Sequence, residues 1–522
     1  MKLNKNIKNL LPIAAFALSL TATSCVSDLD VDPTIDKNTD ITFNQDANFR
    51  KIYANMALTG QKGPDGNADI ADIDEGTSDF FRQLWCMNEL PTDEAICSWG
   101  DAGIPEYNYG TWDASHGMVT CEYYRLYMGI SLCNEFLTKT EGLTDDHTKT
   151  ERAEARFMRA MYYYYATDFF GNVPFMTVVS EELAPQKSRA EICKFIEDEL
   201  LDCVKDDMKA PGTNTYGRAD QAAAWLLLAR LYLNSEVYTG TARWEDAAIY
   251  AKKVMDSTYD LSPSYKNLFM GDNDKNGAQI EIILPILQDG IQTQNYGGSL
   301  FLIASTHKDD MPSTGTSENW AGNRARKQLI DKFFSGKAPN GDVDEMVSAA
   351  KDDRAMFYGK DRTLEIKKPS DFKQGFSCAK FTNLHADGSA THDSKFVDMD
   401  VPFMRAAEAW LTYAEAEKRL GNDGECKMAI DYLRNRAGKY TQSKYTLNEI
   451  CDEWAREFYY EGRRRMDLIR FGKFGGDSDY TWEWKGGSKD GGTIEASRNV
   501  YGIPTKECVA NSNIKQNPGY GN

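Results

Sequence analysis

The fold of this chain is constrained most by long segments in which apolar residues recur at every third or fourth position. The clearest case is residues 152–170, with Ala153, Phe157, Ala160, Met161 and Tyr164 at this spacing. Apolar residues with this period line one face of an α-helix. The run GNVP follows at 171–174, and glycine and proline close together are typical of a helix end.

The same period predicts further helices, over residues 44–58, 219–232, 244–255, 405–420, 425–437 and 447–460. We expect 219–232 and 244–255 to form one pair, with Trp225 on the packed face, and 405–420 and 425–437 to form another. Helix pairs with small residues at their crossing resemble tetratricopeptide units. Long insertions separate these pairs, so they are not tandem repeats.

Two long segments show neither helical nor strand periodicity. Residues 258–328 and 473–522 are irregular and rich in turn-forming residues. Binding residues are often carried on loops that a rigid scaffold holds in place. We therefore expect the helices to act as the scaffold and such segments to display a binding surface.

The N-terminus predicts export. Lys2, Lys5 and Lys8 precede an apolar run at residues 10–20, which is shorter than the ~20 residues of a membrane-spanning helix and fits a signal peptide. Cys25 follows Ala-Thr-Ser, which resembles a lipobox. We predict a signal peptide at 1–24 and a lipid-anchored tether at 25–42; the alternative is ordinary cleavage, with Cys25 incidental.

Charge and cysteine content exclude some classes of protein. The formal net charge is −19, whereas nucleic-acid binding needs a basic face. Besides Cys25 there are ten cysteines, spread singly along the chain. A chain of this length can build a hydrophobic core without disulfides, so we expect these cysteines to be mostly buried and free.

No common catalytic motif is present. The sequence holds no P-loop, GxGxxG, GxSxG or HExxH pattern, and its five histidines show no metal-ligand spacing. We therefore predict that the protein is not an enzyme. The alternative is an exported glycoside hydrolase, because a catalytic carboxylate pair could occur among 79 acidic residues without a local signal.

One loop has the spacing of a calcium site. Asp272, Asp274 and Asn276 precede Gly277 at alternate positions, as in the first half of an EF-hand loop. The glutamate expected at the twelfth position is replaced by Ile283. A structural Ca²⁺ is one interpretation, and a solvated acidic turn is the other; no cofactor is required.

Four ordered motifs resemble the RagB/SusD family. They are RFMRA at 156–160 with FGNVPF at 170–175, GRA at 217–219 with ARLYL at 229–233, EGRRRMDLIRFG at 461–472, and IP at 503–504 with QNPGY at 516–520. The resemblance spans nearly the whole chain. It implies a mostly α fold, with four tetratricopeptide-like helix pairs as scaffold and a loop-rich, short-strand half that binds glycan. The Arg and Glu residues of EGRRRMD are expected to hold the fold by ion pairs.

The resemblance is strongest to starch-binding members of the family, which carry a shallow aromatic arc. It implies that Trp99, Tyr296 and Trp320 form such an arc, with Arg82 beside it. Aromatic faces suit the C–H faces of sugars, and a guanidinium can donate to hydroxyl groups. Cys97 and residues 100–102 depart from the starch-binding pattern, which has a tryptophan and an amide there.

The prediction from sequence is therefore a single domain at 43–522, with helix pairs at about 150–256 and 400–472 and ligand-binding loops at about 60–125 and 258–330. By resemblance, it would be a lipid-anchored protein of the outer membrane at the cell surface. It would bind starch or another α-glucan and deliver it to a SusC-like TonB-dependent transporter. The alternatives are a different glycan, and a helical scaffold that binds a peptide.

Overall fold

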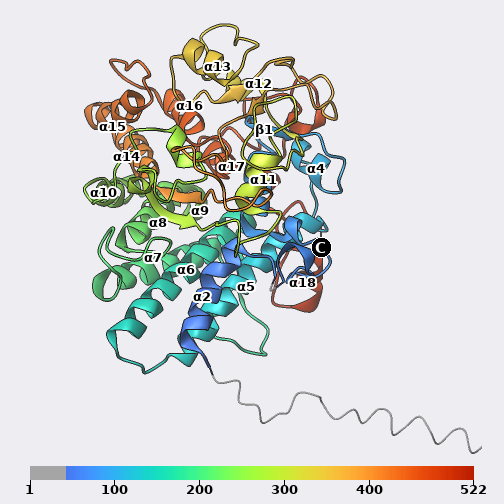
Figure 1. The fold of residues 1–522 in the computed structure, drawn as a ribbon. Helices are drawn as coiled ribbons and strands as arrows, with labels where there is room; N and C mark the ends of the chain where they lie inside the picture. The colour runs from blue at the N-terminus through green and yellow to red at the C-terminus, as the bar shows by residue number, and fades with distance from the viewer. Residues whose placement is uncertain (1–42, 61, 522) are drawn as a thin grey trace, which may run out of the picture. The chain divides into compact units, whose positions relative to one another are not determined.

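Long helices stack one against the next along one side of the chain. The computed structural model describes residues 43–60 and 62–521. In Figure 1 the stack climbs from α2 to α15, and each member contacts the next. Its members are α2 (Gln45–Ala57), α5 (Gly117–Lys139), α6 (Asp146–Phe170), α7 (Arg189–Asp206), α8 (Gln221–Leu233), α10 (Trp244–Met255), α14 (Ala406–Leu420) and α15 (Asp423–Arg436).

All seven helices predicted from periodicity are present. Trp244–Met255 has the predicted bounds, and the other predicted helices begin or end within a few residues of theirs. Trp225 of α8 is half-buried and its indole nitrogen is buried. Lys253 of the partner helix α10 lies with Nζ 5.6 Å from the Trp225 ring centroid, so this side chain faces α10 but is not fully enclosed.

The sequence analysis missed α5 and α7. Helix α5 packs against α6 so closely that a Cβ on Gly129 would lie 2.5 Å from the ring of Tyr162. Its buried side includes Glu122 and Arg125, so hydrophobicity alone does not show its helical period. Helix α7 begins with a capping box formed by Ser188 and Glu191, a signal visible in the sequence.

The remaining described helices have at most 12 residues each. The loop predicted at 60–125 was wrong in part, because it contains α3, α4 and the start of α5. The shorter helices are α3 (Phe80–Glu89), α4 (Ile104–Tyr109), α9 (Ser235–Thr239), α11 (Gly298–Ala304), α12 (Lys327–Ile330), α13 (Val343–Ala350), α16 (Leu447–Phe458), α17 (Arg464–Arg470) and α18 (Thr505–Ala510). Single 3-10 turns lie at Gly63–Asp65, Gly76–Ser78, Lys266–Phe269, Ala278–Ile280, Lys485–Gly487 and Ala496–Asn499.

Among the described residues there are four short antiparallel ladders, two of which join segments more than 100 positions apart in the sequence. They pair β1 (Ala95–Cys97) with β5 (Asn323–Ala325), β2 (Val173–Pro174) with β3 (Gln186–Lys187), β4 (Ile282–Ile286) with β8 (Val401–Arg405), and β6 (Phe357–Tyr358) with β7 (Ser377–Cys378). Strand β8 runs directly into α14, so the β4–β8 ladder ties the irregular segment after residue 258 to the helix stack.

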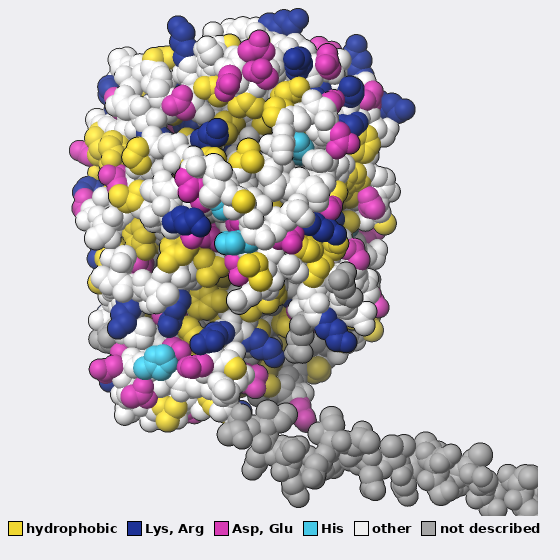
Figure 2. All heavy atoms as spheres, in the orientation of Figure 1, with side chains coloured by type: hydrophobic (Ala, Val, Ile, Leu, Met, Phe, Trp, Pro, Cys, Tyr) yellow, Lys and Arg dark blue, Asp and Glu magenta, His cyan; other side chains and the backbone are white. Residues whose placement is uncertain are grey.

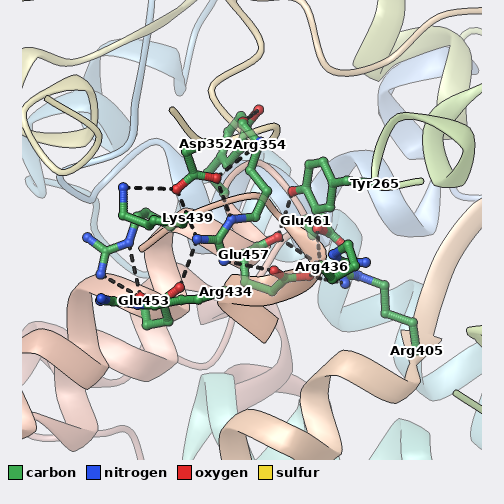
Figure 3. Close-up of polar contacts among 12 residues, drawn as sticks. Tyr265, Asp352, Arg354, Arg405, Arg434, Arg436, Lys439, Glu453, Glu457 and Glu461 are labelled. Atoms are coloured by element: carbon green, nitrogen blue, oxygen red, sulfur yellow. Dashed lines mark hydrogen bonds and ion pairs between the residues drawn. The ribbon is translucent and has the colours of Figure 1, made fainter. Parts of the chain in front are cut away.

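A network of buried ion pairs lies where β8, α15 and α16 meet (Figure 3). Arg405 lies 2.7 Å from a carboxylate oxygen of each of Glu281, Glu457 and Glu461. Arg354 and Arg436 also pair with Glu457. Burial alone would raise the pKa of Glu457, but Arg436, Arg405 and Arg354 hold it well below its usual range. The carboxylate is therefore charged although it is buried.

The arginines of the motif EGRRRMDLIRFG at residues 461–472 extend this pattern of buried pairs. The ion pairs are Arg463–Glu408 at 3.0 Å, Arg464–Asp93 at 2.7 Å, Arg465–Asp168 at 3.0 Å and Arg470–Glu415 at 2.8 Å. All of these groups are buried. The expectation that this motif holds the fold through ion pairs is confirmed, because one short segment is bound to α6, α14 and the loop before β1.

The remaining sequence expectations have mixed outcomes. The ten cysteines from Cys86 to Cys508 are all free and nine of them are buried, as predicted. Residues 45–522 form one compact unit by their contacts. In the described part of the chain, no helix has the length and apolar character to cross a bilayer. The signal peptide, the tether and Cys25 lie outside the described residues.

Replacing Arg405 with methionine should strongly destabilise the protein. The variant would leave Glu281, Glu457 and Glu461 facing one another without their shared cation, and breaking a buried ion pair costs about 3–5 kcal/mol. Urea unfolding curves measure this. As a control, Lys194→Ala removes a solvent-exposed pair with Asp198 and should leave the unfolding midpoint unchanged. Equal effects of the two variants would contradict the role of the buried network.

Candidate functional site

A cleft of about 720 Å³ opens at the loop-rich side of the fold. Its lining includes Arg82, Trp99, Tyr296 and Trp320, the four residues named from the family resemblance. They come from four separate segments, and each is half-buried. The tertiary structure therefore brings all four to one surface, although their role in binding stays a prediction.

The β1–β5 ladder places the two tryptophans at one rim of the cleft. Cys97, the last residue of β1, pairs with Asn323, the first residue of β5. Beyond them, the Ser98 N–H donates to the Gly322 carbonyl at 2.9 Å. Trp99 follows β1 and Trp320 precedes β5, so the antiparallel register makes them neighbours.

Gly322 leaves the space in which the Trp99 side chain lies. Gly322 has a φ of +111°, and a Cβ there would lie 2.3 Å from Trp99 Nε1. Only glycine both adopts this backbone conformation without strain and leaves room for the indole. The glycine lies two residues after Trp320, so one short loop supplies one aromatic ring and supports another.

Arg82 is held by the capped start of α3. The buried Asp79 carboxylate accepts hydrogen bonds from the N–H groups of Arg82 at 2.8 Å and Gly298 at 2.9 Å, which ties the starts of α3 and α11 together. Burial raises the pKa of Asp79, although these two hydrogen bonds act to lower it. The Arg82 guanidinium carbon lies 5.9 Å from the Trp99 ring centroid, and Nη1 donates to the Tyr296 carbonyl at 3.3 Å.

Tyr296 and Trp320 form a tilted pair. Their ring centroids are 6.2 Å apart at an interplanar angle of 47°. Lys395 Nζ donates to the Tyr296 hydroxyl and lies 4.6 Å from its ring centroid. The indole N–H of Trp320 donates to Glu318. Because these polar edges already have partners within the fold, both rings are positioned before any ligand arrives.

Acidic side chains complete the rim. Asp72, Asp74 and Asp101 line the cleft and are exposed. Sequence reasoning did not single out the first two, since nothing local distinguishes them from other surface carboxylates. Asp101 lies in the stretch that departs from the starch-binding pattern. Flat ring faces, one guanidinium and several carboxylates suit a neutral ligand rich in hydroxyl groups.

The predicted calcium loop has another set of partners. Both carboxylate oxygens of Asp272 accept from the Ala386 N–H at 3.0 Å. Asn276 turns its amide nitrogen toward Asp272 and its oxygen toward the Ala278 N–H, and Asp274 is exposed. The Asn276 oxygen is therefore bonded elsewhere and does not share an ion position with Asp272 in this arrangement. Calcium stays a prediction: EGTA would lower the melting temperature if Ca²⁺ binds there, and would leave it unchanged for a hydrogen-bonded turn.

Two family profiles match consecutive parts of the chain. The profile of the SusD family matches residues 232–520, and one described as starch-binding and associating with the outer membrane matches residues 29–233. The starch-binding protein SusD of Bacteroides thetaiotaomicron is 42% identical over 552 residues, which cover 99% of each chain. A SusD-like protein of Bacteroides ovatus is 25% identical over 80% of this chain and 74% of its own length.

Solved structures share the same fold. Surface glycan-binding protein A of Bacteroides thetaiotaomicron, solved in complex with laminarihexaose, matches 91% of this chain and 98% of its own with a TM-score of 0.67 at 19% identity. A laminarin-binding SusD-like protein matches with a TM-score of 0.68 at 20% identity, over 91% of this chain and 99% of its own. The shared fold therefore defines a class of mostly helical proteins. This chain belongs to the SusD family.

Replacing Gly322 with alanine should displace the Trp99 side chain, because the new Cβ would overlap Nε1. Fluorine NMR of fluorotryptophan-labelled protein measures this, with the Trp99 signal assigned from a Trp99→Phe variant. The Trp99 signal should shift. Gly100→Ala is the matched control, since a Cβ there meets nothing within 4 Å. An unchanged spectrum in Gly322→Ala would show that the glycine does not position the indole.

Proposed function

We propose that this protein captures starch or a related α-glucan at the cleft formed by Arg82, Trp99, Tyr296 and Trp320. The observation that carries the proposal is the convergence of these four side chains from distant segments. The 42% identity to a starch-binding protein over 99% of the chain supports the choice of ligand. Rings held in place by the fold cost little ordering entropy on binding.

The charge of the cleft favours a neutral glycan. Three exposed aspartates and one arginine line it, so a uronate or a sulfated sugar would meet net repulsion. Aspartates can accept hydrogen bonds from sugar hydroxyls, and Arg82 can donate to them. A different neutral glycan is the second candidate, because two relatives of the same fold are described with laminarin or a laminarin fragment.

Affinity electrophoresis tests the ligand class. In native gels, amylopectin and pullulan should retard the protein, because both present the α-linked chains that the arc is proposed to follow. Xylan should not. Laminarin in a further gel distinguishes the second candidate. Equal mobility in the amylopectin, pullulan, dextran and xylan gels would contradict the starch proposal.

The proposal is a binding protein and not an enzyme. The rival, a glycoside hydrolase, would release reducing sugar from maltooligosaccharides, whereas a binding protein releases none. A reducing-sugar assay on the same preparation used for electrophoresis separates the two. The assay measures turnover, and the gels measure binding by the same sample.

Trp320→Ala and Trp99→Ala should each weaken binding roughly 30-fold, equivalent to about 2 kcal/mol for a buried aromatic contact. Tyr296→Ala should act in the same direction, and Arg82→Ala more weakly, because exposed polar groups recover hydrogen bonds from water. Isothermal titration with a maltooligosaccharide measures the affinity, and thermal melting reports the fold.

Two tryptophans outside the cleft serve as controls. Trp225→Ala removes another half-buried indole and should leave binding unchanged. Trp454 is fully buried and its Nε1 donates to Glu415 at 2.8 Å, so Trp454→Ala should lower the melting temperature. If Trp320→Ala binds like the wild type, the arc is misplaced.

We further propose that the mature protein is anchored by acylated Cys25 in the outer membrane, faces the cell surface, and passes glycan to a TonB-dependent transporter. The signal-like residues before Cys25 and the outer-membrane association in the description of the matching profile support this. Mass spectrometry of the N-terminal peptide should find acyl chains on Cys25, and crosslinking should recover the transporter. An unmodified Cys25 would contradict the anchor.

A further inference from the structure

Three potential metal ligands meet at the start of two helices. None of the three lines the cleft. Asp46 lies in the first turn of α2, and His147 and Glu151 lie one turn apart at the start of α6. One ligand atom from each lies within 4.8 Å of the other two. His147 Nε2 is 3.3 Å from Glu151 Oε1 and 3.6 Å from Asp46 Oδ1.

These spacings match those around a tetrahedral ion. Zinc binds nitrogen and oxygen ligands at about 2.0–2.2 Å, so two ligand atoms at tetrahedral corners lie about 3.3–3.6 Å apart. The two measured separations from His147 Nε2 fall at or near this range. Residues four apart on a helix lie on one face, which is why the imidazole and the Glu151 carboxylate can reach one ion.

A second set of contacts orients the buried ligand. The Glu151 side chain is 3% exposed, and its other oxygen accepts from Gln45 Nε2 at 2.8 Å. The Gln45 amide also donates to Thr148 Oγ1 at 3.0 Å. Outer partners of this kind fix the direction of a metal-binding carboxylate, and here they leave Oε1 facing the imidazole.

Among the described residues, no lysine or arginine lies within ion-pair distance of Asp46 or Glu151. His147 is therefore the only ion-pair partner of these two carboxylates among the described residues, and a divalent cation would satisfy all three groups. His147 and Asp46 are 60% and 63% exposed, so solvent can supply the fourth ligand, as in open zinc sites.

We propose that Asp46, His147 and Glu151 bind one divalent transition-metal ion, with Zn²⁺ as the ion that suits one imidazole and two carboxylates. The bound ion ties the first turn of α2 to the first turn of α6. This site is separate from the glycan cleft and joins two helices of the stack. Its test therefore does not depend on the proposed function.

Calorimetric titration of the metal-stripped protein with Zn²⁺ is the test. The wild type should bind one equivalent that is lost, or weakened at least tenfold, in His147→Ala and in Glu151→Gln. Bound Zn²⁺ should also slow amide hydrogen exchange in the first turn of α2. Co²⁺ in place of Zn²⁺ should give the visible absorption of a four-coordinate site in the wild type alone.

The matched control is His392→Ala. His392 is also exposed and lies 3.2 Å from a carboxylate, that of Asp398, but it is not part of a three-ligand group among the described residues. This variant should keep the zinc equivalent. The proposal is overturned if the wild type binds no Zn²⁺. It is also overturned if His147→Ala binds Zn²⁺ as the wild type does. Retained zinc binding in a Trp320→Ala variant would show that the two sites are independent.

Discussion

The fold depends on charged groups that are buried and shared among several partners. Glu457 pairs with Arg354, Arg405 and Arg436, which come from three different segments. Taking charges out of water costs several kcal/mol for each ion, and only a well-formed set of partners offsets that cost. Such a network therefore has one acceptable arrangement, and it fixes how the irregular segments lie on the helices.

The position of the cleft follows from the same kind of constraint. Arg464 of α17 pairs with Asp93 at 2.7 Å, two residues before β1. The buried Arg326 donates through Nε to the Ala95 carbonyl at 2.8 Å, at the start of that strand. Strand β1 is thus held from both α17 and β5, and Trp99 follows directly from it. Buried arginines therefore fix the strand from which Trp99 reaches the cleft.

Charged side chains are arranged differently on the surface of the fold and in its interior. Figure 2 shows acidic and basic side chains interspersed over the face in view, without a large basic patch. Inside, many charges are paired in defined sets, such as Arg230 with Glu408 at 2.6 Å. Exposed pairs contribute little to stability and are screened by salt, so the buried pairs specify the arrangement of the chain.

The helices were largely predictable, because apolar period and helix-end signals act over a few residues. Trp244–Met255 and the end of α6 at Phe170 follow from such local patterns. Helix α5 was not predictable in this way, because it buries Glu122 and Arg125, and the ion-pair partner of Arg125, Asp69, lies elsewhere in the chain. Family resemblance named Arg82, Trp99, Tyr296 and Trp320, yet no local pattern brings residues 82 and 320 together. Only the tertiary structure did so, through the β1–β5 register, the Asp79 cap and the close approach at Gly322, since each joins residues more than 200 positions apart.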